Sequence, residues 1–362
     1  MQRKFPRPLK KIVVKIGSSL IATYKMKPRT AQLRSLVKQI SLLKNRGVDV
    51  VLVSSGAIVL GLGELNESVR PTDLAQLQAR AAIGQSVLMK LYNDLFKKNK
   101  LKCGQVLLTW EDFDNRERFV NARNTLEAIL DAGVIPIINE NDTISTDEIK
   151  FGDNDKLAAL VASLIHADLF LILSDVEGLY DLKGEEKKIF EEIKEITREI
   201  EGLASGPSDK NVSRGGMIAK LHAIKIATHA NIPCVIGHGE LENVLLRIFE
   251  GEKIGTLFVE KEEKLLSRKH WISFGAKPKG SIVVDDGAKR AIVDGGRSLL
   301  LPGVVSFKGH FNSQEVVVIC DQNDVEIGRG IINYSSTDLQ KLDEKKDKRE
   351  LIHRDDLVLS TR

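Results

Sequence analysis

Cysteine and aromatic residues are scarce in this sequence of 362 residues. Aromatic residues make up 5% of the chain, and its three cysteines, Cys103, Cys234 and Cys320, lie far apart and form no C-x-x-C pair. Such spacing indicates neither a zinc site nor a disulfide framework, and it fits a reducing compartment. With 42% hydrophobic and 29% charged residues, the composition is typical of an ordinary globular protein rather than a fibrous or disordered one.

Long apolar runs and a strong excess of one charge are also missing. No apolar stretch approaches the roughly 20 residues that a membrane span requires, so we expect no membrane association. The basic and then apolar beginning of the chain resembles a signal peptide in outline, but Lys15 interrupts its apolar part and no small-residue cleavage site follows. We therefore expect a cytoplasmic protein. Its net charge of +4 is too small to argue for nucleic-acid binding by itself.

Several common catalytic motifs are absent as well. The sequence has no G-x-x-x-x-G-K-[ST] phosphate-binding loop and no G-x-G-x-x-G after a predicted strand. His353-Arg354-Asp355 resembles the catalytic loop of protein kinases, but no glycine-rich loop or D-F-G accompanies it, so we regard it as coincidental. No Ser, His and Asp set occurs in a nucleophile-elbow context, which gives hydrolase chemistry little support.

Strand and helix patterns alternate over most of the chain. Apolar, β-branched runs that are typical of strands buried on both faces occupy residues 12–16, 48–53, 105–108, 134–138, 169–173 and 233–236. Helical patterns lie between them, at residues 30–45, 73–98, 118–130, 156–166 and 216–230. The alternation predicts an α/β domain whose mostly parallel sheet is sandwiched by helices.

Two later regions depart from this alternation. Residues 183–211 are rich in Lys and Glu, with an amphipathic stretch at 189–200, and they indicate either a lid or a solvated charged face. From residue 280 long helices give way to short strand patterns separated by turn signals such as Asp285-Asp286-Gly287; these patterns lie at 281–284, 304–307, 315–320 and 327–332. The length of the chain allows two domains. We assign them to residues 1–258 and 280–362, joined by a basic linker at 259–279.

Residues 137–155, IINENDTISTDEIKFGDND, hold the densest group of amides and carboxylates. A predicted strand leads directly into the first cluster, residues 139–142, and a second cluster, residues 153–155, precedes a helical pattern. Because ligands of open α/β sheets bind beyond the carboxyl ends of the strands, we expect a small charged ligand here. The alternative is that Asp153 or Asn154 merely caps the helix.

Three glycine-bearing turns suit the binding of an anion. Lys15 and Gly17 end the first strand, and Ser54-Ser55-Gly56 ends the second. Backbone N–H groups at such turns can approach a phosphate closely, and a lysine in a buried strand is costly unless its charge is used. The third turn, Arg214-Gly215-Gly216, opens a helix and places Lys220 one turn inside it. Alone it is equally typical of a flexible helix start, but with Lys15 it supplies two cations for a phosphate chain.

A family resemblance rests on six segments taken together. They resemble glutamate 5-kinases, and they are IVVKIGSS (12–19), VSSGAI (53–58), RERFVNARNT (116–125), INENDT (138–143), FGDND (151–155) and RGGMIAK (214–220). The match continues through GTLF (255–258) and RKHWI (268–272) to SLLLPGVV (298–305), which resembles a PUA domain. Single motifs are shared with other amino-acid kinases, including acetylglutamate kinase and aspartokinase. The combination of NEND, GDND and the tail is much more specific, and it covers nearly the whole chain.

The resemblance implies an amino-acid kinase fold with a small PUA-like barrel. It also implies an enzymatic activity. That activity is ATP-dependent phosphorylation of the side-chain carboxylate of L-glutamate to L-glutamyl 5-phosphate, the first step of proline biosynthesis. It also implies feedback inhibition by proline, a homo-oligomer (dimer or tetramer), and transfer of the product to glutamyl phosphate reductase. Mg²⁺ would accompany ATP with few protein ligands, because it keeps much of its own water; we name no metal-ligating residue.

Site residues follow from the resemblance position by position. The catalytic candidates are Lys15, Lys220 and Asp155, with Asp155 holding the two lysines in place. The candidates for binding glutamate are Ser55, Asp142 and Asn154. The candidates for binding ATP are Lys15, Gly17, Ser174, Asp175, Arg214, Gly215, Gly216, Met217, Ile218, Ala219 and Lys220.

The sequence departs from the family pattern at two positions. Ser174 stands where the family usually has Thr, and the hydroxyl is kept. Arg214 replaces a Thr that is common before the paired glycines, so it adds a charge beside the phosphates and puts the typical nucleotide affinity in doubt.

Two alternatives to glutamate phosphorylation remain. An enzyme like acetylglutamate kinase is the nearest rival, and the tail argues against it. A PUA protein that binds RNA and keeps a vestigial kinase fold is the other, since the linker carries Arg268, Lys269, Lys277 and Lys279. A decayed site would not be expected to keep its catalytic candidates together, and the modest net charge attracts phosphate weakly.

Overall fold

The computed structural model describes residues 2–144, 154–181, 188–204, 214–261, 267–341 and 349–360. The chain divides into two compact units: Met1–Asp112 with Arg116–Lys264, and Phe113–Asn115 with Leu265–Arg362. Asp153, most of the loop between the two polar clusters, and residues 182–187 and 205–213 lie outside the described residues. None of the described helices is long and apolar enough to cross a membrane.

The first unit is built on an eight-stranded sheet in the order β3-β4-β2-β1-β5-β9-β10-β8. Its strands are β1 (Lys11–Ile16), β2 (Asp49–Ser54), β3 (Cys103–Leu108), β4 (Ile135–Glu140), β5 (Leu169–Ser174), β8 (Glu192–Ile193), β9 (Cys234–His238) and β10 (Thr256–Phe258). The six strands from β3 to β9 in this order are parallel, and β10 is antiparallel to β9. The mostly parallel sheet predicted from the apolar runs is therefore confirmed.

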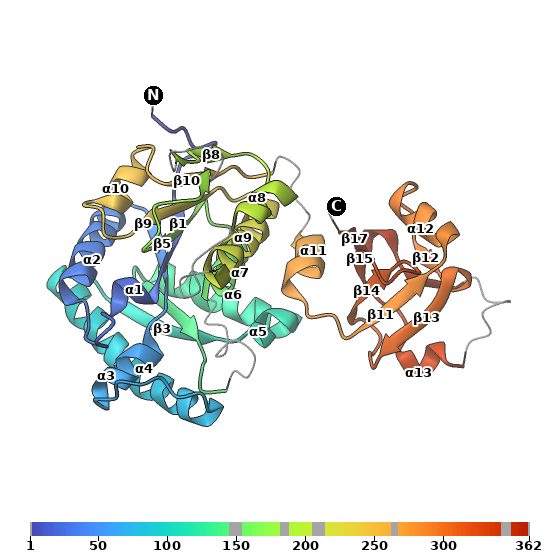
Figure 1. Ribbon diagram of the computed structural model, residues 1–362, viewed down its shortest axis with the longest axis horizontal. Helices are drawn as coiled ribbons and strands as arrows, with labels where there is room; N and C mark the ends of the chain where they lie inside the picture. Colours follow the sequence, from blue (N-terminus) through green and yellow to red (C-terminus); the bar gives the residue numbers. More distant parts are fainter. Residues whose placement is uncertain are drawn as a thin grey trace. The chain divides into compact units, whose positions relative to one another are not determined.

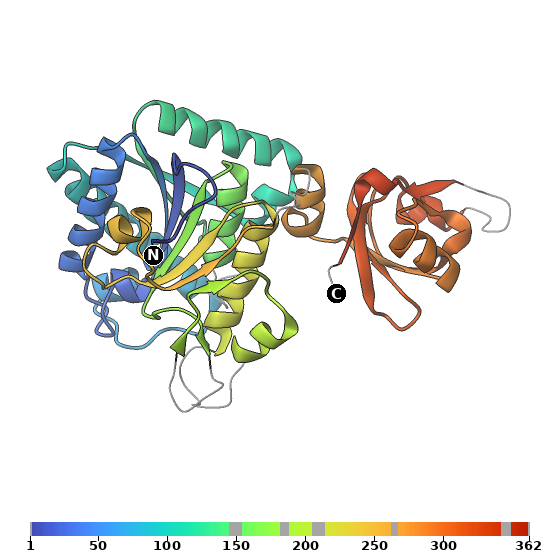
Figure 2. The same cartoon turned by 90° about the horizontal axis from the view of Figure 1, so that it is seen from above.

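Helices cover both faces of this sheet. They are α1 (Ser18–Ile21), α2 (Thr30–Asn45), α3 (Ala57–Glu64), α4 (Leu74–Lys98), α5 (Trp110–Asp114), α6 (Arg116–Asp131), α7 (Asn154–Leu164), α8 (Arg198–Ala204), α9 (Arg214–His229) and α10 (Val244–Phe249). Helices α2 and α10 lie on one side of the strands and α7 and α9 on the other (Figure 1, Figure 2). Helix α7 packs against β1, β2, β5 and α9, so it crosses the middle of the sheet.

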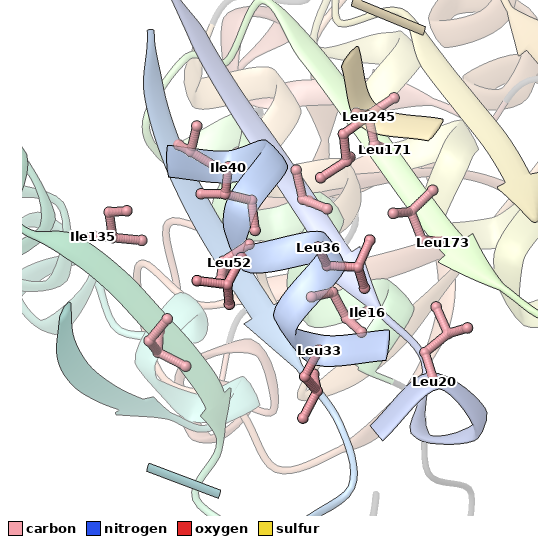
Figure 3. Packing of buried hydrophobic residues seen from close by; sticks show 14 of the residues in the cluster. Ile16, Leu20, Leu33, Leu36, Ile40, Leu52, Ile135, Leu171, Leu173 and Leu245 are labelled. Atoms are coloured by element: carbon pink, nitrogen blue, oxygen red, sulfur yellow. The ribbon is translucent and has the colours of Figure 1, made fainter. Parts of the chain in front are cut away.

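A large hydrophobic cluster lies between α2 and the sheet. Figure 3 shows Leu36 and Ile40 of α2 facing Ile16 and Leu52 of the central strands, and all four side chains are fully buried. Burying each such side chain contributes about 1.5–3 kcal/mol. Because side chains alternate across a strand, Ile16 on this face places Lys15 on the opposite face. The alternation thus directs the lysine toward α7 and α9.

Two glycines let α3 and α4 pack backbone to backbone. A Cβ on Gly84 of α4 would lie 1.8 Å from the carbonyl oxygen of Ala57, and one on Gly61 of α3 would lie 1.9 Å from that of Arg80. Neither position can carry a side chain without moving a helix. The contact holds α4 directly behind the turn that follows β2, and Gln85 is the next residue of that helix.

The second unit contains a five-stranded sheet in the order β13-β11-β14-β15-β17 and a two-stranded one, β12-β16. Its strands are β11 (Gly280–Val284), β12 (Leu299–Leu300), β13 (Val304–Gly309), β14 (Val316–Cys320), β15 (Glu326–Ile331), β16 (Glu350–Ile352) and β17 (Leu357–Leu359). Its helices are α11 (Ser267–His270), α12 (Asp286–Val293) and α13 (Ser336–Leu339), with a π-helix at Trp271–Gly275. Buried aliphatic residues and Phe311 form a separate core. The two sheets make the tail β-rich, as predicted.

Two local predictions were wrong. Residues 189–200 do not form one amphipathic element: they contain β8, part of the main sheet, and Ile189 of the antiparallel pair β6 and β7 (Tyr180–Asp181, Lys188–Ile189). Asp285-Asp286-Gly287 is a helix start, because the Asp285 carboxylate accepts the N–H of Ala288 and caps α12. Of the two candidate caps of α7, Asn154 lies in the first turn of the helix, and Asp153 lies outside the described residues.

Candidate functional site

Five predicted site residues lie where the central strands end. Strands β1, β2, β4 and β5 are parallel neighbours, so their carboxyl ends meet at one edge of the sheet. Gly17 follows β1, Ser55 follows β2, Asp142 lies two residues after β4, and Ser174 ends β5 with Asp175 next to it. Residues as far apart in the sequence as Gly17 and Asp175 therefore lie at the same edge of the sheet.

The three catalytic candidates form one buried ion cluster. The Lys15 Nζ lies 2.6 Å from Asp155 Oδ1, and the Lys220 Nζ lies 3.0 Å from Asp155 Oδ2. The side chains of Lys15, Asp155 and Lys220 are 7%, 5% and 12% exposed. Two ammonium groups share one carboxylate, so the cluster carries one net positive charge where water is largely excluded.

The electrostatic state of Asp155 follows from its neighbours. Burial would raise the pKa of Asp155, but the charges of Lys15 and Lys220 and their hydrogen bonds outweigh it, so this pKa lies below the ordinary carboxyl value. Asp155 also lies in the first turn of α7, where the helix dipole favours a negative charge. The carboxylate is therefore ionised at neutral pH and holds the two lysines beside each other.

Local structure explains why these distant residues meet. The side chain of Lys15 lies on the face of β1 that α7 covers, and α7 packs against both β1 and α9. Lys220 lies in the second turn of α9, where its Nζ also approaches the carbonyl of Gly216 at 3.4 Å. Helix packing, rather than sequence proximity, assembles the cluster.

Asn154 connects the cluster to the strand ends. Its Nδ2 lies 3.2 Å from the carbonyl oxygen of Ser54, 3.2 Å from Ser55 Oγ and 2.7 Å from Asn139 Oδ1. These bonds tie the start of α7 to β2 and β4. Two predicted glutamate-binding residues, Ser55 and Asn154, are therefore in direct contact. Asp142 is half-buried after β4.

Backbone geometry supports both predicted glycine turns. Gly56 has φ of +101°, a left-handed conformation that strongly favours glycine, and it begins α3. A Cβ at this position would lie 2.7 Å from Ile21 Cγ2. Gly17 begins α1 and packs against β5, since its N–H donates to the carbonyl of Leu173 at 2.9 Å. Both turns therefore lie at the carboxyl edge, and the N–H of Gly17 is engaged within the protein.

The nucleotide-side candidates are less tightly connected. Ser174 is buried at the end of β5, Asp175 is exposed, and Gly216 to Ala219 lie half-buried in the first turns of α9. Arg214 and Gly215 begin that helix, but their side-chain surroundings lie outside the described part of the chain. A cavity of about 220 Å³ borders Ile218 and is lined by Glu201, Leu221 and His222 as well. Among described residues, no group of three His, Cys, Asp or Glu side chains could hold a metal ion.

Sequence reasoning missed part of the polar network behind the site. Asn139 was placed in the polar cluster without a role, although it accepts from Asn154 and donates to Gln85 of α4. Tyr92 of α4, fully buried, shares a 2.9 Å hydrogen bond with Ser54. Burial raises the pKa of Tyr92, so its hydroxyl stays neutral. A glutamine or tyrosine on a helix face carries no periodic signal, so only the tertiary structure reveals these contacts.

Comparison with known proteins defines the class. The amino acid kinase family matches residues 10–238, and the PUA domain matches residues 280–353. The chain belongs to the amino acid kinase family.

Individual relatives show which members of this family the chain resembles. A glutamate 5-kinase of Thermoanaerobacter sp. (strain X514) is 43% identical over 366 residues, which cover 97% of this chain and 98% of that protein. Another, of Geobacter sp. (strain M21), is 41% identical and covers 99% of this chain and 100% of that protein. The likeness therefore extends through both units.

Proposed function

We propose that this protein is an ATP-dependent glutamate 5-kinase, which transfers the γ-phosphoryl group of ATP to the side-chain carboxylate of L-glutamate. The products are L-glutamyl 5-phosphate and ADP, and the reaction is the first step of proline biosynthesis. The observation that carries the proposal is the buried Lys15–Asp155–Lys220 cluster at the sheet edge, beside the Asn154–Ser55 contact. The full-length likeness to glutamate 5-kinases supports the same substrate.

The cluster suits the electrostatics of phosphoryl transfer. This reaction asks the protein mainly for in-line positioning and for stabilisation of charge on the transferred group. The ammonium groups of Lys15 and Lys220 provide that stabilisation in a site of low water content, where each hydrogen bond is worth more than in bulk water. Asp155 sets their separation, and the attacking glutamate carboxylate is already ionised, so no general base is required.

The substrate side is assigned by hydrogen-bonding capacity. The carboxylate of Asp142 suits the α-ammonium group of glutamate, and Asn154 and Ser55 lie together at the ends of α7 and β2. The nucleotide side comprises Gly17, Ser174, Asp175 and the start of α9 from Arg214 to Lys220. ATP enters as its magnesium complex, so the metal comes with the nucleotide and keeps much of its water.

The linker cations favour a structural rather than an RNA-binding role. Arg268 lies 2.6 Å from Asp356, and Lys279 lies 2.8 Å from Asp114, both within the second unit. The backbone N–H of Lys277 also donates to Asp114. Carboxylates beside these groups lower their attraction for phosphate.

The proposal also assigns a role to each segment of the chain and names the partners of the protein. Residues 1–258 bind ATP and glutamate, 259–279 connect, and 280–362 form the PUA-like domain. Proline acts as feedback inhibitor, the protein forms a dimer or tetramer, and the labile product passes to glutamyl phosphate reductase. The enzyme works in the cytoplasm.

Substrate assays separate the proposal from its rivals. Purified protein with MgATP should release ADP in the presence of L-glutamate, and L-proline should lower the rate. ADP release with N-acetylglutamate but not with glutamate would contradict the substrate. Salt-sensitive RNA binding without any glutamate-dependent ADP release would favour a binding protein instead.

A further inference from the structure

A chain of side-chain amides runs from β3 and α4 to the start of α7. Gln85 Nε2 donates to Gln105 Oε1 at 3.2 Å, and Asn139 Nδ2 donates to Gln85 Oε1 at 2.8 Å. Asn154 Nδ2 donates in turn to Asn139 Oδ1 at 2.7 Å. Asn139 is 1% exposed and Asn154 is 9% exposed, so the inner half of the chain is shielded from water. The reaction as described above makes no use of Gln85.

Two backbone groups fix the direction of this amide chain. The N–H of Glu140 can only donate, and it donates to Asn139 Oδ1 at 2.9 Å. The carbonyl of Ser54 can only accept, and it accepts from Asn154 Nδ2 at 3.2 Å. Rotating the amide of Asn139 by 180° would set N–H groups against each other, and rotating that of Asn154 would set oxygens against each other. The donors and acceptors therefore have one consistent order.

This order decides what Asn154 can offer to a ligand. Its NH₂ group is shared among three protein acceptors, the third being Ser55 Oγ at 3.2 Å. No hydrogen bond to its Oδ1 is found among the described residues, so this atom remains to accept one. Ser55 accepts from Asn154, so its own hydroxyl hydrogen remains to donate. An α-amino acid supplies both complements, an ammonium donor and a carboxylate acceptor.

We propose that Gln85 is a positioning residue for the amino-acid substrate. By accepting from Asn139, it holds Asn139 in the orientation that keeps Asn154 Oδ1 directed toward the α-ammonium group. The inference rests on the proposed function and adds a determinant of substrate affinity in α4. Without an acceptor at position 85, a buried N–H of Asn139 is left unpaired, so Asn139 is held less firmly and positions Asn154 less well.

Steady-state kinetics of three full-length variants test this role. Gln85→Met keeps the length of the side chain but removes the acceptor, and it should raise the KM for glutamate about tenfold, the worth of one hydrogen bond. The kcat and the KM for ATP should stay close to those of the unaltered protein. Gln85→Glu keeps an acceptor and should restore most of the affinity. The matched control, Gln105→Met, changes only the exposed end of the chain and should alter neither KM.

The outcomes separate this inference from the proposed function. If the unaltered protein has no turnover with glutamate, the proposed function fails and the role of Gln85 fails with it. If the unaltered protein is active and Gln85→Met leaves the KM for glutamate unchanged, only the role of Gln85 is overturned. Equal losses in Gln85→Met and Gln85→Glu, together with a lowered Tm, would show a structural role and would also overturn it.

Discussion

Two lysine–aspartate contacts, one in each unit, have almost the same length but very different surroundings. Lys15 lies 2.6 Å from Asp155 in the first unit, and Lys289 lies 2.7 Å from Asp321 in the second. Lys15 is 7% exposed, whereas Lys289 is 30% exposed and can return to water if its partner is lost. Distance alone therefore does not distinguish the two.

Charge balance distinguishes them. Asp321 accepts one lysine and the backbone N–H groups of Asn323 and Val325, so it closes a turn with no net charge left over. Asp155 instead holds a second lysine, Lys220, and among the described residues this leaves one positive charge of the cluster uncompensated at the end of parallel strands. A buried excess charge is costly for folding, and the anionic substrate that we propose for this site would offset that cost. An ion pair is thus informative about function when its charges do not cancel.

Removing one lysine of the first cluster should have the largest effect on activity. In Lys15→Met we expect kcat for glutamate phosphorylation to fall by about 10²–10³-fold, as when one preorganised donor to a transition state is removed. Initial rates of ADP release measure it. Lys289→Met is the control in the second unit and should keep the full rate; equal rates in the two variants would contradict the comparison.

Neutralising the carboxylate should cost the most stability. Asp155→Asn leaves two buried ammonium groups facing each other, and we expect the free energy of unfolding to fall by about 3–5 kcal/mol. Asp321→Asn should cost less, because Lys289 can be solvated. Urea unfolding followed by circular dichroism gives both values. A larger loss for Asp321→Asn would reverse our ranking.

Acidification should weaken the folded state through both carboxylates. The pKa of Asp155 is lowered, with its burial outweighed by the two lysines, and the pKa of Asp321 is lowered by its hydrogen bond to Lys289 and by backbone N–H groups. A lowered pKa contributes stability above the ordinary carboxyl pKa, and that stability is lost as pH falls through the folded-state value. We expect the unfolding free energy to decline from about pH 5 to about pH 2. Asp155→Asn should decline less steeply over this range; an unchanged slope would show that Asp155 does not contribute.

The contact between Lys156, the residue after Asp155, and Trp110 should contribute the least to stability. Lys156 Nζ lies 3.4 Å from the centre of the Trp110 ring, so this lysine is stabilised by an aromatic face rather than by the ion cluster. Trp110→Leu should lower the unfolding free energy by about 0.5–2 kcal/mol, and Trp110→Phe by less, because a ring is kept. Thermal unfolding can rank the two variants. Greater damage from Phe than from Leu would count against a cation–π contact.

The sheet and its active edge were predictable because their signals are local. Apolar runs mark strands buried on both faces, and parallel strands bring their carboxyl ends together, so Lys15 and Asn139 were expected at one edge. The pairing of Asp155 with Lys15 and Lys220 came from a family resemblance, since no local pattern links residues so far apart in the sequence.

The failures also have physical reasons. The residue types of Asp285-Asp286-Gly287 favour turns and helix caps alike, so the prediction of a turn was wrong. The strand β8 is two residues long and depends on β10 and on the chain's start, where Arg3 donates to the carbonyl of Glu191. Gln85 carries no sequence signal, because its role depends on the direction of hydrogen bonds among folded side chains.

Acyl phosphate formation tests the central claim most directly. Hydroxylamine traps glutamyl phosphate, so its yield can be compared in the unaltered protein, Lys220→Met and Lys289→Met under identical MgATP and L-glutamate. We predict a high yield for the unaltered protein and Lys289→Met, and a yield lower by about 10²-fold or more for Lys220→Met. Full yield from Lys220→Met would contradict the claim that the uncompensated charge of the first cluster serves phosphoryl transfer.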